Sequence, residues 1–181
     1  PLAAGLACGA PTPTAVPTEP PAPTEAAAAS SSSSGGLTTF TDQSKYLELD
    51  VPADWEYSQT VDKDNNNWYW DVFTSPDGHA RIDSIVYDDG QPFVGTQSGR
   101  TALQWLHQNY SNTGAEGDIR ISDDSMQKDG SERLIWSSKE GKYSGYTYFE
   151  VRDKNNFLMF TVNWGDGVKD QYFDTLMSVV D

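Results

Sequence analysis

Three strand-like segments follow one another between residues 133 and 164, and they constrain the fold more than any other feature of the sequence. RLIWSS (133–138), YSGYTYFEVR (143–152) and NFLMFTVNW (156–164) are rich in β-branched and aromatic residues. Only the short segments KEGK (139–142) and DKN (153–155) separate them. Links this short join antiparallel neighbours, because a parallel pair needs a crossover of a dozen residues or more. The sequence therefore predicts an antiparallel meander.

Further strands and two helices are predicted outside this meander from the spacing of the apolar residues. The strand candidates are 47–51, 68–74, 80–87 and 118–122, and the helix candidates are 101–110 and 168–180. Ser98 or Thr101 is the expected cap of the first helix. Strands outnumber helices, and tight turns link consecutive strands. This pattern predicts an α+β domain in which helices pack on an antiparallel sheet.

The composition changes sharply at Gly35–Gly36. Residues 9–36 are almost entirely Pro, Thr, Ala, Ser and Gly, with Glu19 and Glu25 as the only charged side chains. Such a segment cannot bury enough apolar surface to offset the entropy lost on ordering. We therefore expect a disordered linker over residues 9–36 and one folded domain over residues 37–181.

The charge balance excludes several classes of partner. The formal net charge is −15 and the pI is near 4.2. This balance argues against nucleic acid and against direct binding to anionic lipid headgroups, since both attract Lys and Arg. It favours a basic protein partner. One cysteine forms neither an internal disulfide nor a thiolate metal site, and two histidines leave little room for a histidine-rich one.

Cys8 stands at the end of LAAGLAC, a run of small and apolar residues, and Gly9 follows it. This pattern is typical of a bacterial lipobox, in which the cysteine becomes the new N-terminus and carries diacylglycerol. Gly5 at position −3, where leucine is usual, departs from the pattern. We therefore interpret residues 1–8 as the end of a lipoprotein signal peptide with its lipid attachment site. The alternative is an unmodified free thiol.

The segment VDKDNNNWYWD (61–71) suggests a metal site only weakly. Asp62, Asp64 and Asn66 occupy alternate positions, as oxygen ligands of calcium do in an EF-hand loop. The glycine and the final bidentate glutamate of such a loop are missing, and no helices flank the segment. A polar turn between two strands is the favoured interpretation, and no metal cofactor is expected.

Nothing in the sequence indicates an enzyme. Motifs for a serine nucleophile, a Walker phosphate loop or a dinucleotide fold are absent. The acidic pairs Asp88–Asp89 and Asp123–Asp124 are interpreted as solvated turn charges, because adjacent residues of an extended chain point to opposite faces. His79 and His107 have no partner that the sequence identifies.

The aromatic residues allow two interpretations. Trp68 and Trp70 share one face of their predicted strand, and Tyr146 and Tyr148 share a face of another. Burial in the core is the favoured interpretation. The alternative is an exposed aromatic surface that stacks on sugars or on a partner.

The segment YLELDVPADWEY (46–57) resembles the start of PsbP-like domains, a family named for an extrinsic protein of the oxygen-evolving photosystem. Later segments resemble later parts of the same domain in the same order, so that the resemblance covers roughly residues 40–181. These segments are DVFTSPDGHARIDSIVY, TALQWLHQNY, SERLIWSS, GYTYFEVR, NFLMFTVNW and QYFDTLMSVV. The resemblance implies an antiparallel sheet flanked by helices on both faces, an α/β/α sandwich. It also implies a non-enzymatic, extracytoplasmic domain that is often lipid-anchored in bacteria.

From these features we expect a membrane-anchored extracytoplasmic lipoprotein that serves as a non-catalytic accessory or assembly subunit of a photosynthetic or electron-transport membrane complex. Its expected partners are membrane lipid, through Cys8, and subunits of that complex. The sequence identifies no partner-binding residues. The alternative function is a cell-surface module that binds carbohydrate or cell-wall polymer through exposed aromatic residues.

Overall fold

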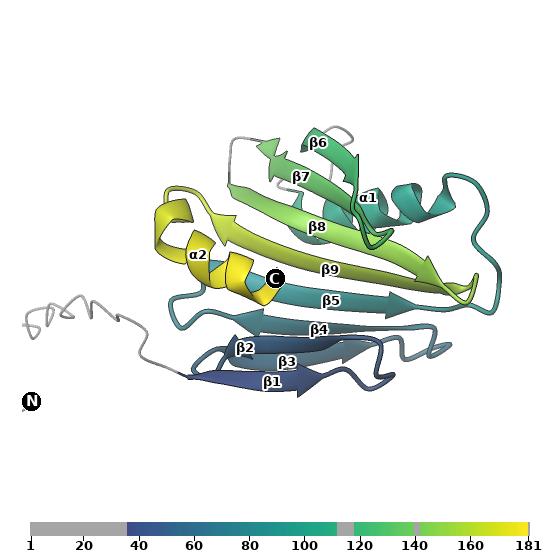
Figure 1. Cartoon of the computed structure of the whole chain (residues 1–181), viewed down its shortest axis with the longest axis horizontal. Helices are drawn as coiled ribbons and strands as arrows, with labels where there is room; N and C mark the ends of the chain where they lie inside the picture. Colours follow the sequence, from purple (N-terminus) through teal and green to yellow (C-terminus); the bar gives the residue numbers. More distant parts are fainter. Residues whose placement is uncertain (1–35, 112–117, 140–141, 181) are drawn as a thin grey trace, which may run out of the picture. The chain divides into compact units, whose positions relative to one another are not determined.

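The structure is a computed structural model that describes residues 36–111, 118–139 and 142–180. Cys8, the predicted signal-peptide end and the predicted linker before Gly36 lie outside the described residues. In chain order the elements are β1 (Leu37–Thr41), β2 (Glu48–Pro52), β3 (Glu56–Val61), β4 (Trp68–Thr74), β5 (Ala80–Tyr87), α1 (Gln97–Tyr110), β6 (Ile119–Met126), β7 (Glu132–Ser138), β8 (Tyr143–Arg152), β9 (Asn156–Gly165) and α2 (Lys169–Val180) (Figure 1).

Seven strands form one sheet in the order β3-β4-β5-β9-β8-β7-β6, and every pair of neighbours is antiparallel. The chain makes a first meander from β3 to β5, and α1 then connects β5 to β6 at the opposite edge of the sheet. A second meander returns from β6 to β9, which pairs with β5. The predicted α+β class and the antiparallel meander over residues 133–164 are confirmed.

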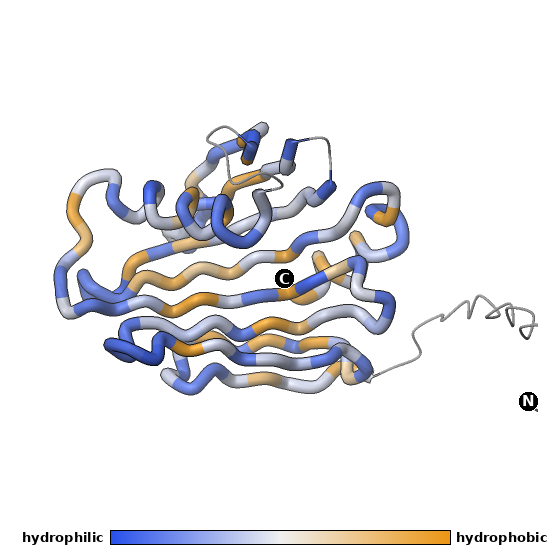
Figure 2. The backbone as a smooth tube through the Cα atoms, turned by 180° about the vertical axis from the view of Figure 1, so that it is seen from behind, coloured by the Kyte–Doolittle hydropathy of each residue, from blue (hydrophilic) through white to orange (hydrophobic). Residues whose placement is uncertain are grey.

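Alternate residues of β9 contribute to two separate core clusters. Phe160 and Val162 belong to the cluster that contains Leu176 of α2, whereas Met159 belongs to the cluster that contains Leu106 of α1. This follows from the two-residue period of a strand. In Figure 1, α2 lies in front of the sheet and α1 behind it. Seen from behind, the strands carry recurring hydrophobic segments (Figure 2).

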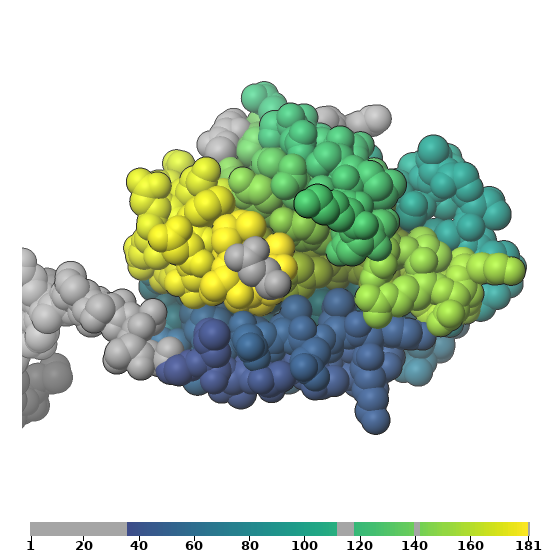
Figure 3. Space-filling model, in the orientation of Figure 1, coloured from purple at the N-terminus to yellow at the C-terminus, as the bar shows by residue number. Residues whose placement is uncertain are grey.

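The strands β1 and β2 form a separate antiparallel hairpin. Phe40 of this hairpin packs on Phe73 of β4, with 4.9 Å between the ring centroids, and on Tyr57 of β3 at 5.4 Å. The carboxylate of Asp42 accepts hydrogen bonds from the hydroxyl of Tyr69 and from a backbone N–H of the hairpin turn. In Figure 3 the hairpin forms the lower part of the visible face, beneath α2. The predicted strand 47–51 therefore forms, but outside the main sheet.

Two predicted boundaries are wrong. Helix α1 begins at Gln97, so that Ser98 and Thr101 lie inside the helix and do not cap it. The side chain of Gln97 instead accepts a hydrogen bond from the backbone N–H of Val94, at 2.7 Å. Strand β6 continues past the predicted end at Ser122, because its pairing with β7 resumes after a β-bulge.

Candidate functional site

Two adjoining hollows lie beside α1, the larger one against β3, β4 and β5 and the smaller one against the end of β5 and residues 89–93. Their volumes are about 520 and 380 Å³, and Tyr87, Thr101 and Gln104 line both. We call them together the aromatic groove. Its other lining residues are Thr60, Trp68, Trp70, Asp89, Gln91, Pro92, Phe93, Gln97, Arg100, Trp105, Gln108 and Asn109. Both volumes fall in the range of small-molecule sites.

The strand register brings the aromatic residues of the groove together. Trp68 at the start of β4 lies opposite Tyr87 at the end of β5, and Trp70 follows two residues later on the same face. Trp105 of α1 meets Trp68 edge-on, with 5.3 Å between the ring centroids and 71° between the ring planes. The groove therefore has aromatic walls that come from both the sheet and the helix.

Helix α1 presents a polar stripe to the groove. Gln97, Thr101, Gln104 and Gln108 recur at the three- and four-residue spacing that places side chains on one helical face. The opposite face of the same helix carries the buried residues Ala102, Leu106 and Tyr110. Within the described part of the chain, the exposed side-chain amides of Gln104 and Gln108 have no hydrogen-bond partner.

The tryptophans divide between the core and the groove. Trp55, Trp136 and Trp164 are buried in the core, whereas Trp68, Trp70 and Trp105 are only half-buried and line the groove. The favoured interpretation of core burial holds in part for Trp70, which packs against the core cluster beneath α1, and is wrong for Trp68, which belongs to no core cluster of the described residues. Tyr146 and Tyr148 are also half-buried and pack against the core cluster beneath α2.

A buried polar network lies on the α1 side of the central strands. The Tyr110 hydroxyl at the end of α1 donates to Asp83 of β5, and the Asn163 amide of β9 lies 2.8 Å from Tyr110 Oη and 3.3 Å from Asp83 Oδ2. Asp83 is 1% exposed. Burial raises the pKa of its carboxyl to about 7, against the opposing effect of the Tyr110 hydrogen bond. Sequence patterning did not identify this residue.

The weak metal candidates lie in the turn between β3 and β4. The Asp62 carboxylate accepts hydrogen bonds from the backbone N–H groups of Asp64, Asn65 and Asn67 at 3.0, 3.3 and 3.2 Å. Asn66 takes the left-handed conformation, with φ of 56°. The hydrogen bond from Asn67 is the main cause that lowers the pKa of Asp62. The favoured interpretation as a polar turn fits this geometry, and the expectation that no metal cofactor binds stays a prediction.

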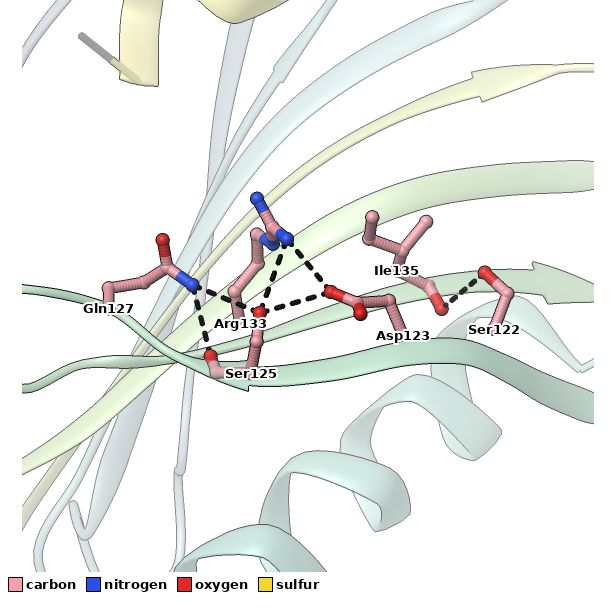
Figure 4. Close-up of polar contacts among 6 residues, drawn as sticks. All are labelled: Ser122, Asp123, Ser125, Gln127, Arg133 and Ile135. Atoms are coloured by element: carbon pink, nitrogen blue, oxygen red, sulfur yellow. Dashed lines mark hydrogen bonds and ion pairs between the residues drawn. The ribbon is translucent and has the colours of Figure 1, made fainter.

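The two acidic pairs differ in their surroundings. Asp88 and Asp89 follow β5 and each accept a backbone N–H two residues ahead, as expected for turn charges. Asp123 and Asp124 instead lie within β6, next to the bulge, so their interpretation as turn charges is wrong. Asp123 pairs with Arg133 of β7 at 2.8 Å (Figure 4). This ion pair and the adjoining serine and glutamine contacts occupy the edge strand of the sheet.

The described residues contain neither a metal-binding cluster nor a membrane-spanning helix. No group of three or more His, Cys, Asp and Glu side chains in residues 36–111, 118–139 and 142–180 is arranged to hold a metal ion. Neither α1 nor α2, the helices of the described segments, is long and apolar enough to cross a membrane.

Comparison with known proteins identifies the fold. The sequence matches no family model and no curated protein. The solution structure of cyanobacterial PsbP (CyanoP) from Synechocystis is similar with a TM-score of 0.56 at 12% identity, over 81% of this chain and 90% of that chain. A Pseudomonas aeruginosa protein of unknown function aligns with a TM-score of 0.39 at 10% identity, over 81% of this chain and 94% of that one. The likeness to CyanoP shows that the chain has a PsbP-like fold.

Proposed function

We propose that this protein is a lipid-anchored extracytoplasmic lipoprotein that acts as a non-catalytic accessory or assembly subunit of a membrane protein complex. The observation that carries the proposal is the fold likeness to CyanoP over most of both chains. A shared fold alone does not determine function. The proposal therefore also uses the lipobox-like Cys8 and the Pro-rich segment behind it.

The finer architecture belongs to the same proposal. An α/β/α sandwich of the PsbP-like kind would leave the two sheet edges and the outer helix faces available for docking. The assignment of α1 and α2 to different core clusters supports this arrangement.

Charge indicates how the domain would dock. All 12 Lys and Arg residues and all but two of the 27 acidic residues follow Gly36 in the sequence. The folded part is therefore strongly acidic, and a basic surface on the partner complex would attract it. A lipid on Cys8 would hold the domain near the membrane and raise its effective concentration at that complex.

Membrane fractionation tests the proposal. The full-length protein and the Cys8→Ser variant are expressed in the native host, and the membranes are solubilised in mild detergent. We expect the unaltered protein to co-purify with membrane-complex subunits and the variant to move to the soluble fraction. Recovery of the unaltered protein only as a free soluble monomer would overturn the proposal.

A further inference from the structure

We infer that the aromatic groove binds a neutral glycan chain. This activity is independent of the accessory role proposed above. It rests on the shape and chemistry of the groove, and it assigns a ligand class to residues of α1, β4 and β5.

The first support is the absence of charge where the walls are most aromatic. The hollow between β4 and α1 is lined by Trp, Tyr, Thr, Gln and Asn side chains and by no charged residue of the described segments. Charged residues make up 22% of this chain, and its net charge is −15. The adjoining hollow contains one residue of each sign, Asp89 and Arg100. A groove without net charge on an acidic domain favours a ligand without net charge.

The second support is the kind of polar group in the groove. Side-chain amides and hydroxyls both donate and accept hydrogen bonds, as the hydroxyl groups of a sugar do. Gln104 and Gln108 are exposed, and within the described residues their amides have no partner that a ligand would need to displace. The amide stripe therefore favours a polyol.

The third support is the arrangement of the aromatic rings. Half-buried Trp68 and Trp105 combine an apolar ring with a polar indole N–H, which suits a ligand that has both C–H faces and hydroxyls. Trp70 contributes its ring alone, because its indole N–H is buried. The edge-on contact between Trp68 and Trp105 fixes the two rings relative to each other. Binding would therefore cost little side-chain entropy.

The fourth support is length. The polar stripe runs from Gln97 to Gln108, which is roughly 16 Å along a helix that rises ~1.5 Å per residue. The two hollows share three lining residues and so continue into each other. A site this long suits a chain of several sugars better than a single one.

A titration of the full-length protein tests the inference. The probes are the neutral oligosaccharides cellohexaose, maltohexaose and chitohexaose, an acidic oligogalacturonate, and a synthetic peptide of residues 9–36. Intrinsic tryptophan fluorescence and its quenching by acrylamide report binding, because the groove tryptophans are accessible. We expect at least one neutral oligosaccharide to bind and to reduce the quenching.

Matched variants locate the binding. Gln104→Ala and Gln108→Ala remove exposed amides of α1, and each is expected to weaken glycan binding about tenfold, the loss of one or two good hydrogen bonds. Gln171→Ala removes an exposed amide of α2 outside the groove and is expected to leave binding unchanged. Circular dichroism checks that all three variants keep the fold.

Three results would overturn the inference. They are the absence of binding by every neutral oligosaccharide, equal or tighter binding of the oligogalacturonate or of the peptide, and unchanged glycan binding in both α1 variants. Binding of the peptide alone would assign the groove to the proline-rich segment instead.

Discussion

Asp83 is a carboxylic acid in a place that water does not reach. Its contacts are the Tyr110 hydroxyl and the Asn163 amide, and both come from other elements. Its pKa of about 7 means that the folded protein keeps a proton that the unfolded chain, with a pKa of ~3.9, gives up. This proton adds to the free energy of unfolding. The added stability is fully present below pH ~4 and is lost as the pH rises through about 7.

The Asp83→Asn variant is expected to remove this pH dependence. An asparagine oxygen accepts the same hydrogen bonds and never ionises. Between pH 5 and pH 8 the free energy of unfolding of the variant, relative to the wild type, is expected to rise by roughly 2 kcal/mol. Urea unfolding at both pH values measures this difference. An equal difference at both pH values would show that Asp83 titrates normally.

Gly145 of β8 illustrates a packing constraint at the same scale. A Cβ atom at this position would lie 2.6 Å from the carbonyl oxygen of Val162 and 2.8 Å from the Trp136 ring. Both neighbours are buried, and the first belongs to the backbone of β9. The close packing of β8 against its neighbours therefore leaves no room for a side chain at position 145.

The Gly145→Ala variant is expected to lose about 2–3 kcal/mol of stability through overpacking. Gly99→Ala is the matched control, since it sits inside α1 and its added Cβ would meet no described atom within 4 Å apart from the adjoining residues and backbone of its own helix. The control is expected to gain up to about 1 kcal/mol, because alanine favours a helix. Thermal unfolding of both variants provides the test, and similar melting temperatures would contradict it.

The hairpin of β1 and β2 acts as a cover at the scale of elements. Asp71 of β4 lies between Tyr69 and Phe73 in the strand and is fully buried on the face that the hairpin contacts. Its Oδ1 atom accepts hydrogen bonds from Tyr57 and Gln59, each at 2.8 Å. Burial raises the pKa of Asp71, and the hydrogen bonds partly oppose this effect. The hairpin therefore keeps water from an acidic group.

Loss of the Phe40 ring is expected to loosen this cover. Phe40→Ala removes the contact with Phe73 and should cost about 2 kcal/mol of stability, less than for a fully buried phenylalanine. Amide hydrogen exchange in β1 and β2 should speed up more than in β8 and β9. Phe40→Leu, which keeps most of the apolar volume, is the control. An equal increase of the exchange rate in the hairpin and in the seven-stranded sheet would contradict a local role of Phe40.

The sequence predicted elements best where apolar residues are dense or recur with a clear period, and β4 and β5 have their predicted bounds. Strands β7, β8 and β9 and helix α2 agree with their predicted ranges to within one residue. Strands β1 and β3 were not predicted, because their residues LTTFT and EYSQTV are mostly exposed and polar. The groove was not predicted either. It requires the placement of α1 beside β4, and Trp68 and Trp105 meet only through that long-range packing.

The whole molecule is predicted to combine an acidic folded domain with a lipid anchor. Mass spectrometry of the native protein is expected to find residues 1–7 removed and diacylglycerol on Cys8. An unmodified Cys8 with residues 1–7 still attached would contradict the anchor. It would leave the glycan inference intact, because the groove lies in the folded domain.

The most direct test of the accessory role is the size of the particle that contains the protein. Native electrophoresis of detergent-solubilised membranes is expected to show it in a complex far larger than the 19.9 kDa chain. Added salt should release it, because screening weakens the attraction between an acidic domain and a basic partner. Migration as a free monomer at low salt would contradict the proposed function.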